Sequence, residues 1–457
     1  MTDHSRGSNI AGRQEQVSAA TTIPTGNAEP GVRPPLALSA TGLARYSVMA
    51  FPLAFAGLPI YLHAPDFYAV TLEIPLATLG TALLALRLID AVQDPFIGSL
   101  SDRFHLHRGT IIALGATMLG AGFWMLFHPV TQAPILWFAA SVLICTTGFS
   151  IVSINFQAIG GLWLTSAANR TRITASREAV GLIGLLFAAV TPPILAEVSG
   201  RQAAFHWLAL GYLPLLAIAF WFLLRWMRTT AFETPAPDQY KIGWKLLFRD
   251  RWRALFFGLT FLNTFASAIP AVLVLFFIRD RLGAENYTGL FLLVYFLAGA
   301  ISMPVWTHLA RKFGKLRAWQ FSLVAAVFTF CWAALLGPGD LWAYALVCML
   351  SGLALGADLA LPPAILADHI DIDQRQNEAS RLFAIMAFMS KSALAIATGL
   401  ALPLLGLFGY HPNVAMTPDL NFALSLTYAG LPCIFKLAVL GGLIVFEKDL
   451  AQGKSAV

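Results

Sequence analysis

Two acidic residues inside an apolar segment are the first chemical feature of this sequence. The stretch RLIDAVQDPFIGSLSDR, residues 87–103, follows the apolar run LATLGTALLAL. Asp90 and Asp94 are four residues apart, so in a helix they share a face, with Arg87 on the same side. Two carboxylates one turn apart can ligate a small hard cation or hold a proton. An internal salt bridge with Arg87 is the alternative, but it accounts for only one of the two acids.

The composition places these acids in a membrane. The 457-residue chain is 58% hydrophobic and 12% charged, and a soluble domain carries about twice that charged fraction. An aspartate at the bilayer centre costs about 2.5–3.5 kcal/mol, so both acids must face protein, water or a cation. The net charge of +6 does not indicate nucleic-acid binding, because most basic residues lie in short loops between apolar runs.

Twelve segments are long and apolar enough to cross the hydrocarbon, which needs about 20 residues. They are 44–66, 76–100, 110–130, 134–160, 177–198, 206–227, 252–278, 286–309, 318–337, 341–367, 381–408 and 421–446. The polar remainder predicts a disordered cytoplasmic tail (1–43), a cytoplasmic linker (228–251) and a second tail (447–457). Two six-helix halves, 44–227 and 252–446, lie on either side of the linker.

The distribution of basic residues predicts the orientation. Loops on the side of the termini hold many of them, namely Arg103, Arg108, Arg170, Arg172, the linker residues, Arg311, Lys312, Lys315, Arg317 and Arg375. The opposite loops hold Arg201, Arg279 and Arg281. Because cytoplasmic loops are enriched in Lys and Arg, both termini are predicted to be cytoplasmic, in an inner or plasma membrane.

The two halves also repeat weakly. GSLSDRFHLHRG lies between the second and third spans, and THLARKFGK lies between the eighth and ninth, about 209 residues later. Such duplication is typical of secondary transporters, whose substrate site lies between the repeats near the midplane.

Further polar residues lie inside other spans. The fourth span carries Ser150, Ser153, Asn155 and Gln157, and each of these alone could serve helix packing instead of solute binding. Arg177 opens the predicted fifth span, where an arginine can snorkel to the interface.

Two charged residues lie too deep to snorkel. Lys391 sits about ten residues into the eleventh span and needs an acidic or water-lined partner. Asp358 lies in the middle of the tenth span, where it is either a second acid on the ligand pathway or the partner of a lysine. Lys436 in the twelfth span is given no role.

Enzymatic function is not predicted. The sequence has no Walker loop, nucleophile elbow or zinc-helix motif. His105 and His107 lie in a basic loop without a third ligand, so no cofactor and no metal beyond the coupling cation is expected.

The segment 87–103 resembles the second-span signature of the glycoside–pentoside–hexuronide:cation symporters, the melibiose-carrier type of the major facilitator superfamily. A second segment, LADHIDIDQRQNEASRLFAIMAFMSKSALA (366–395), looks like the family's loop and span-11 motif. The resemblance implies an all-α integral membrane protein, a twelve-transmembrane-helix major facilitator bundle with two pseudo-symmetric six-helix halves.

The resemblance also implies roles for individual residues. Asp90 and Asp94 would bind the coupling cation, Na⁺, Li⁺ or H⁺, with help from Ser150. Lys391 would lie near this cation across the interface of the halves. Arg177 matches a span-5 arginine close to the sugar.

The solute-binding positions depart from the melibiose carrier. That carrier recognises its sugar through acids on its first and fourth spans. Here the first span, YSVMAFPLAFAGLPIYLHAP, has no acid before Asp66, and the fourth-span positions are Ser153 and Gln157. A simple galactoside is therefore not the expected solute.

The predicted function is cation-coupled symport of a small organic solute, with a sugar or glycoside-like compound as a candidate, by a monomer in contact with membrane lipid. Two alternatives stay open. One is a lysolipid or amphiphile carrier, and the other is a non-transporting receptor or assembly factor on the same fold.

Overall fold

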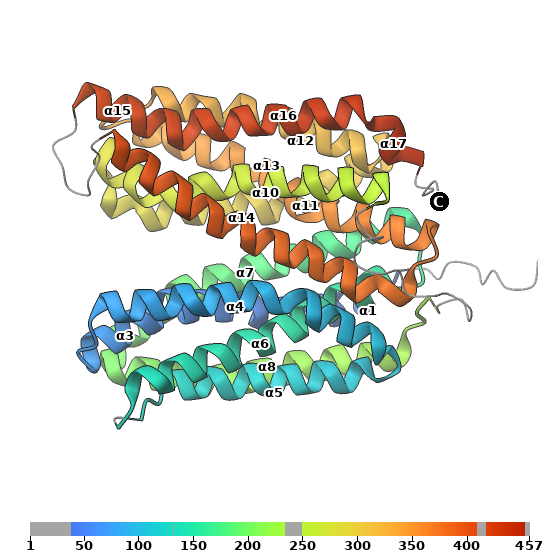
Figure 1. Ribbon diagram of the computed structural model, residues 1–457, viewed down its shortest axis with the longest axis horizontal. Helices are drawn as coiled ribbons and strands as arrows, with labels where there is room; N and C mark the ends of the chain where they lie inside the picture. Colours follow the sequence, from blue (N-terminus) through green and yellow to red (C-terminus); the bar gives the residue numbers. More distant parts are fainter. Residues whose placement is uncertain (1–37, 131, 234–248, 409–416, 453–457) are drawn as a thin grey trace, which may run out of the picture. The chain divides into compact units, whose positions relative to one another are not determined.

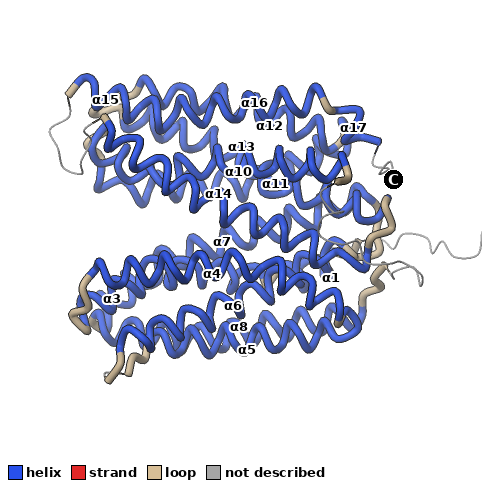
Figure 2. The backbone as a smooth tube through the Cα atoms, in the orientation of Figure 1, coloured by secondary structure: helices blue, strands red, loops and turns tan. Residues whose placement is uncertain are grey.

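The computed structural model describes residues 38–130, 132–233, 249–408 and 417–452, and these are almost entirely helical (Figures 1 and 2). In the described part, an isolated bridge between Trp163 and Phe232 is the only β-type pairing. The α-helices are α1 (Ala40–Ser47), α2 (Ala50–Leu58), α3 (Ala64–Thr71), α4 (Leu76–Arg103), α5 (Arg108–Leu126), α6 (Pro134–Gly161), α7 (Ala167–Ser199), α8 (Arg201–Thr229), α10 (Arg251–Phe276), α11 (Thr288–Phe313), α12 (Lys315–Phe330), α13 (Leu341–Ile372), α14 (Ala379–Leu407), α15 (Pro418–Ser425), α16 (Leu431–Val445) and α17 (Glu447–Gln452).

Eleven of the described helical segments are long and apolar enough to span a membrane. The helix α4 has the length of a span, 28 residues, but it carries Arg87, Asp90, Asp94, Asp102 and Arg103. With α4 as the second span, the helices confirm the predicted all-α, twelve-span fold class.

The helices pack as two groups, one from residues 40–229 and one from residues 251–452. In Figure 1 the first group runs from blue to green and the second from yellow-green to red. Close packing within the first group depends on small residues, because a Cβ at Gly148 of α6 would lie 2.4 Å from the backbone nitrogen of Leu119 in α5. Between the groups, α4 packs along α14, and α7 packs along α11 and α13.

The first span of each group contains a π-helical turn in its second half, Pro59–His63 in one and Phe277–Arg281 in the other. A third π-helical turn, Leu426–Gly430, lies in the last span, so these turns do not mark the repeat of the two halves.

Several predicted boundaries fall outside the described residues. These include most of the tail 1–43 and of the linker 228–251. The helix α1 begins at Ala40, inside the stretch predicted as tail. The loops 104–107, 162–166 and 373–378 lie at one end of the helices, which we call the basic end.

Candidate functional site

Lys391 of α14 is held by two carboxylates and a hydroxyl. Its Nζ lies 2.9 Å from Oδ1 of Asp90, 2.9 Å from Oδ1 of Asp94 and 2.8 Å from Oγ of Ser150. It also donates to the backbone carbonyl oxygen of Asp90 at 3.3 Å. The ammonium is thus surrounded by oxygen acceptors, and it stands where a coupling cation could bind.

Three helices build this site. The i, i+4 spacing on α4 aligns Asp90 and Asp94, α6 supplies Ser150, and α14 brings Lys391 from the other half. Asp94 is fully buried, and Asp90 and Ser150 are 4% and 2% exposed. Carboxylates buried this deeply are tolerated only when paired, so the lysine contributes to holding α4 and α14 together.

Further residues orient Asp90, and sequence reasoning missed them. Gln93 donates from Nε2 to Oδ1 of Asp90 at 3.0 Å, and Thr147 donates to Oε1 of Gln93 at 2.9 Å. The hydroxyl of Tyr61 lies 3.4 Å from Oδ2 of Asp90. Gln93 could have been found from its position one turn after Asp90, but Tyr61 and Thr147 come from other helices.

Arg87 differs from its expected placement. Its guanidinium lies 4.7 Å from the centroid of the Tyr61 ring, and its side chain is exposed. The basic partner described for both aspartates is Lys391. The alternative interpretation, a salt bridge between Arg87 and one aspartate, is therefore wrong, because the guanidinium lies on the aromatic face of Tyr61 while α14 delivers an ammonium to the carboxylates.

The other polar residues of the fourth span divide into two groups. The buried Asn155 donates from Nδ2 to Oγ of Ser101 in α4 at 2.9 Å and to the carbonyl oxygen of Ile151 at 2.8 Å, which is a helix-packing contact. Gln157 donates to Oγ of Ser153 at 3.2 Å, and both side chains are half-buried. A role for these residues in solute binding stays a prediction.

Arg177 does not open its span, because α7 begins ten residues earlier at Ala167. The snorkelling interpretation is therefore wrong. The polar sequence before Arg177 concealed the start of a helix whose first turns pack against α13. The buried guanidinium pairs instead with Glu178, at 2.9 Å from Nε and 2.6 Å from Nη2 to Oε1. Sequence reasoning missed Glu178 as an acid inside the membrane span.

Asp358 forms an ion pair with Lys436, for which no role was predicted. The distance from Lys436 Nζ to Asp358 Oδ2 is 2.7 Å. Lys436 also donates to Oδ1 of Asn263 at 3.0 Å, and Trp319 donates to Oδ1 of Asp358 at 3.2 Å. Of the two expectations for Asp358, the structure favours pairing with a lysine, inside the second helix group.

A carboxylate from the first half caps a helix of the second half at the basic end. Asp102 of α4 accepts the backbone N–H of Ser380 at 2.9 Å and that of Arg381 at 2.8 Å, in the first turn of α14. Arg108 donates to the same carboxylate at 3.1 Å. A carboxylate at a helix N-terminus satisfies free N–H groups and interacts favourably with the helix dipole. The contact is close, since a Cβ at Gly98 would lie 2.5 Å from Cβ of Ala384.

A second group of charges joins α7 to α13 at the same end. The buried Arg170 lies 2.6 Å from Glu233, 2.9 Å from Asp371 and 3.4 Å from Asp368. Lys315 also pairs with Asp368, at 2.5 Å. Burial raises the pKa of Glu233 to about 7, although Arg170 acts to lower it. Glu233 can therefore change its charge near neutral pH.

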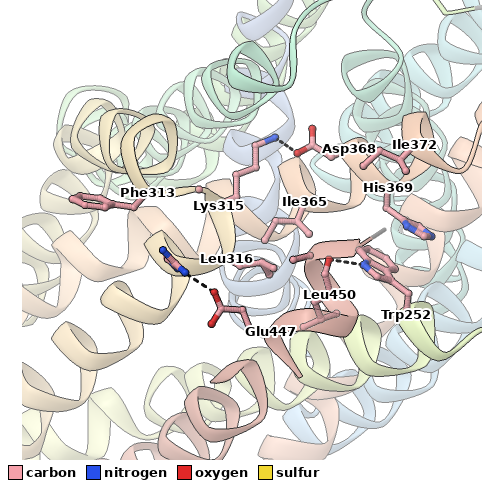
Figure 3. Close-up of a pocket in the computed structure, with 13 residues that line it drawn as sticks. Trp252, Phe313, Lys315, Leu316, Ile365, Asp368, His369, Ile372, Glu447 and Leu450 are labelled. Carbon is pink, nitrogen blue, oxygen red and sulfur yellow. Dashed lines mark hydrogen bonds and ion pairs between the residues drawn. The ribbon is translucent and has the colours of Figure 1, made fainter. Parts of the chain in front are cut away.

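A cavity of about 250 Å³ lies beside this network in the second half (Figure 3). Its wall includes Trp252, Lys315, Asp368 and His369, together with Glu447 and Leu450 of α17. This cavity is separate from the candidate cation site, because its lining does not include Asp90, Asp94, Ser150 or Lys391.

The family model described as MFS/sugar transport protein matches residues 45–448. The chain belongs to this family. Its membership confirms the resemblance to the glycoside–pentoside–hexuronide:cation symporters of the major facilitator superfamily, and it makes the protein a multi-pass membrane protein of a symporter family.

Individual relatives are distant but extend over most of the chain. The uncharacterized symporter YjmB of Bacillus subtilis is 21% identical, over 83% of this chain and 86% of its own length. The glucuronide carrier protein homolog of Escherichia coli is 23% identical, over 81% and 84%. The crystal structure of the E. coli fucose:proton symporter superimposes with a TM-score of 0.61 at 14% identity, over 88% of this chain and 98% of that one. This structural likeness shows the fold.

Proposed function

We propose that this protein is a secondary active transporter that couples symport of a small organic solute to Na⁺ or H⁺. The observation that carries the proposal is the placement of the Lys391 ammonium among Asp90, Asp94 and Ser150. These oxygens form a buried monovalent-cation site between the two halves.

The charges of the site support coupling to one monovalent cation. Two carboxylates and one ammonium sum to a charge of −1, which one Na⁺ or one proton neutralises. An uncompensated charge in a buried site is strongly disfavoured. Occupation by a cation therefore favours conformations that enclose the site.

Lys391 supplies a physical link between cation binding and conformational change. It belongs to α14 in the second half, and it binds carboxylates of α4 in the first half. A cation that binds the same carboxylates beside Lys391 weakens the ion pairs of the lysine and so weakens the link between the helices. Since a ligand shifts a conformational equilibrium by its differential affinity for the two states, cation binding would bias the halves toward another arrangement.

We further propose that the basic end faces the cytoplasm, with both termini on that side of an inner or plasma membrane. One chain supplies both halves of the site, so a monomer suffices for transport. Labelling of a cysteine introduced after Gln452 with an impermeant reagent, in oriented vesicles, tests the orientation. Light scattering of the protein in detergent measures its molar mass and so tests whether it is a monomer.

The decisive experiment follows the melting temperature of the purified protein in a Na⁺ series at constant ionic strength and two pH values. Sodium at 100 times its dissociation constant stabilises by about 2.7 kcal/mol. Asp94→Asn should fold, since an amide is cheaper to bury than a carboxylate, but it should lose the response.

The control removes a second intramembrane ion pair as a unit, with Asp358→Asn and Lys436→Met together, and it should keep the response. A Na⁺-specific shift lost in Asp94→Asn supports sodium coupling, and a pH response lost in that variant supports proton coupling. A wild type that shows no Na⁺ shift and has the same pH dependence as Asp94→Asn would contradict the proposal.

A further inference from the structure

Glu178 is an acid inside the membrane-spanning part of α7 that the candidate cation site does not use. It lies roughly 16 Å along α7 from Ala167, and Asp94 lies roughly 14 Å along α4 from Arg103, at 1.5 Å per residue. Both lengths are counted from the basic end. Glu178 and the cation site are therefore at similar distances from the basic end.

The neighbours of Glu178 one turn away on either side contact the second half. Thr174 donates from Oγ1 to the carbonyl oxygen of Ala360 in α13 at 2.8 Å. Leu182 packs in one buried cluster with Met303 and Ala360. Because residues four apart share one face of a helix, Glu178 faces the boundary between the halves.

Glu178 also points away from the lipid side of α7. The exposed apolar residues of this helix form a stripe roughly 120–180° around the helix from Glu178, at about 100° per residue; they are Ile183, Phe187, Val190 and Ile194. The Glu178 side chain is nevertheless 28% exposed. Its exposed part thus faces the boundary between the halves rather than lipid.

The pairing of Glu178 leaves it able to bind a ligand. Both hydrogen bonds described for Arg177 and Glu178 use Oε1, so Oε2 retains its capacity to accept from a hydroxyl. The buried guanidinium already balances the charge of the carboxylate. A neutral polyol would gain a charge-assisted hydrogen bond here, whereas an anionic solute would meet a carboxylate of like charge.

We propose that Glu178 is the solute-recognising carboxylate and that it selects uncharged polyhydroxylated solutes, such as glycosides, over the matching uronides. The inference rests on the proposed symport function, and it adds the class of solute.

The test compares neutral and acidic forms of one ligand. Melting temperatures are measured in saturating Na⁺ with methyl glucoside, methyl galactoside and methyl xyloside, and with methyl glucuronide and methyl galacturonide. A neutral glycoside should stabilise the wild type more than its uronide does. Glu178→Gln should weaken glycoside binding by roughly tenfold or more, since a hydrogen bond to a charged group is lost. It should also improve uronide binding, because Arg177 loses its counter-charge.

Glu197→Gln is the matched control, because it makes the same change at an exposed position of the same helix. It should leave the glycoside shift unchanged. The Na⁺ shift measured without solute should persist in Glu178→Gln, which separates this inference from the cation site. Preference for uronides in the wild type, no shift with any of the glycosides, or an unchanged glycoside affinity in Glu178→Gln would each overturn the inference.

Discussion

Lys391 determines the charge balance of the candidate cation site. Its ammonium contacts the same carboxylates that a coupling cation would need, so lysine and cation compete. Lys391→Met should therefore lower stability without Na⁺ by about 3–5 kcal/mol, the usual cost of breaking a buried pair. The same variant should bind Na⁺ more tightly than the wild type. Sodium titrations monitored by melting temperature measure both effects.

Lys436→Met is the control for this experiment. It also removes an intramembrane ammonium from a carboxylate, that of Asp358, at 2.7 Å. It should lower stability without changing the Na⁺ midpoint. An unchanged Na⁺ midpoint in Lys391→Met would show that lysine and cation do not share a site.

The sequence predicted single residues well where the evidence was local. The spacing of Asp90 and Asp94 and the depth of Lys391 both follow from position along one helix. That Asp358 pairs with a lysine was one of two expectations, but the choice of Lys436 could not be predicted, because the two residues lie 78 positions apart on different helices. Glu178 was missed for another reason: its neighbour Arg177 was placed at an interface, so the acid was not recognised as intramembrane.

At the scale of secondary-structure elements, hydropathy predicted the number of membrane-spanning helices. It did not predict where helices begin or finish near the basic end. The helix α7 starts ten residues before the predicted span, and α13 extends to Ile372 rather than 367. These extra turns are polar because they carry contacts between the halves, such as those of Arg170 with Asp371. A pattern based on lipid exposure cannot detect helical turns that pack on charged partners.

Glu233 makes the stability of the charged contacts between α7 and α13 depend on pH. Burial raises its pKa from 4.5 to about 7, with Arg170 lowering it and Asp371 raising it. Between these values the folded protein holds a proton that the unfolded chain releases. Stability contributed by this group is therefore greatest at low pH and falls as pH rises through this window. The melting temperature should fall from pH 5 to pH 8, and less steeply in Glu233→Gln.

The same substitution at Glu285, which is exposed, is the control for Glu233. It should leave the slope of melting temperature against pH as in the wild type. Asp368 and Lys315 also belong to this network. The informative quantity is therefore the difference between Glu233→Gln and wild type in the slope of melting temperature against pH. Equal slopes would contradict the raised pKa of Glu233.

At the scale of the whole molecule, the two halves meet closely where α4 passes the start of α14. Ser380 and Arg381 donate backbone hydrogen bonds to Asp102 across this contact. A Cβ at Gly98 would lie 2.5 Å from Cβ of Ala384 and 2.8 Å from the carbonyl oxygen of Ser380. Only glycine fits this approach, so a larger residue should force the halves apart at the basic end.

Gly98→Val should therefore shift the molecule toward a conformation open at this end. Overpacking typically costs about 1–3 kcal/mol, so the amides of Ser380 and Arg381 should exchange hydrogen roughly 5- to 150-fold faster. Hydrogen exchange followed by mass spectrometry measures this directly. Gly80→Val makes the same change on the same helix, where a Cβ meets nothing within 4 Å, and should leave exchange at both amides unchanged. Since Lys391 binds α4 from α14, wedging the helices apart should also tighten Na⁺ binding. Equal exchange in the two variants would mean that this contact does not control how the halves close.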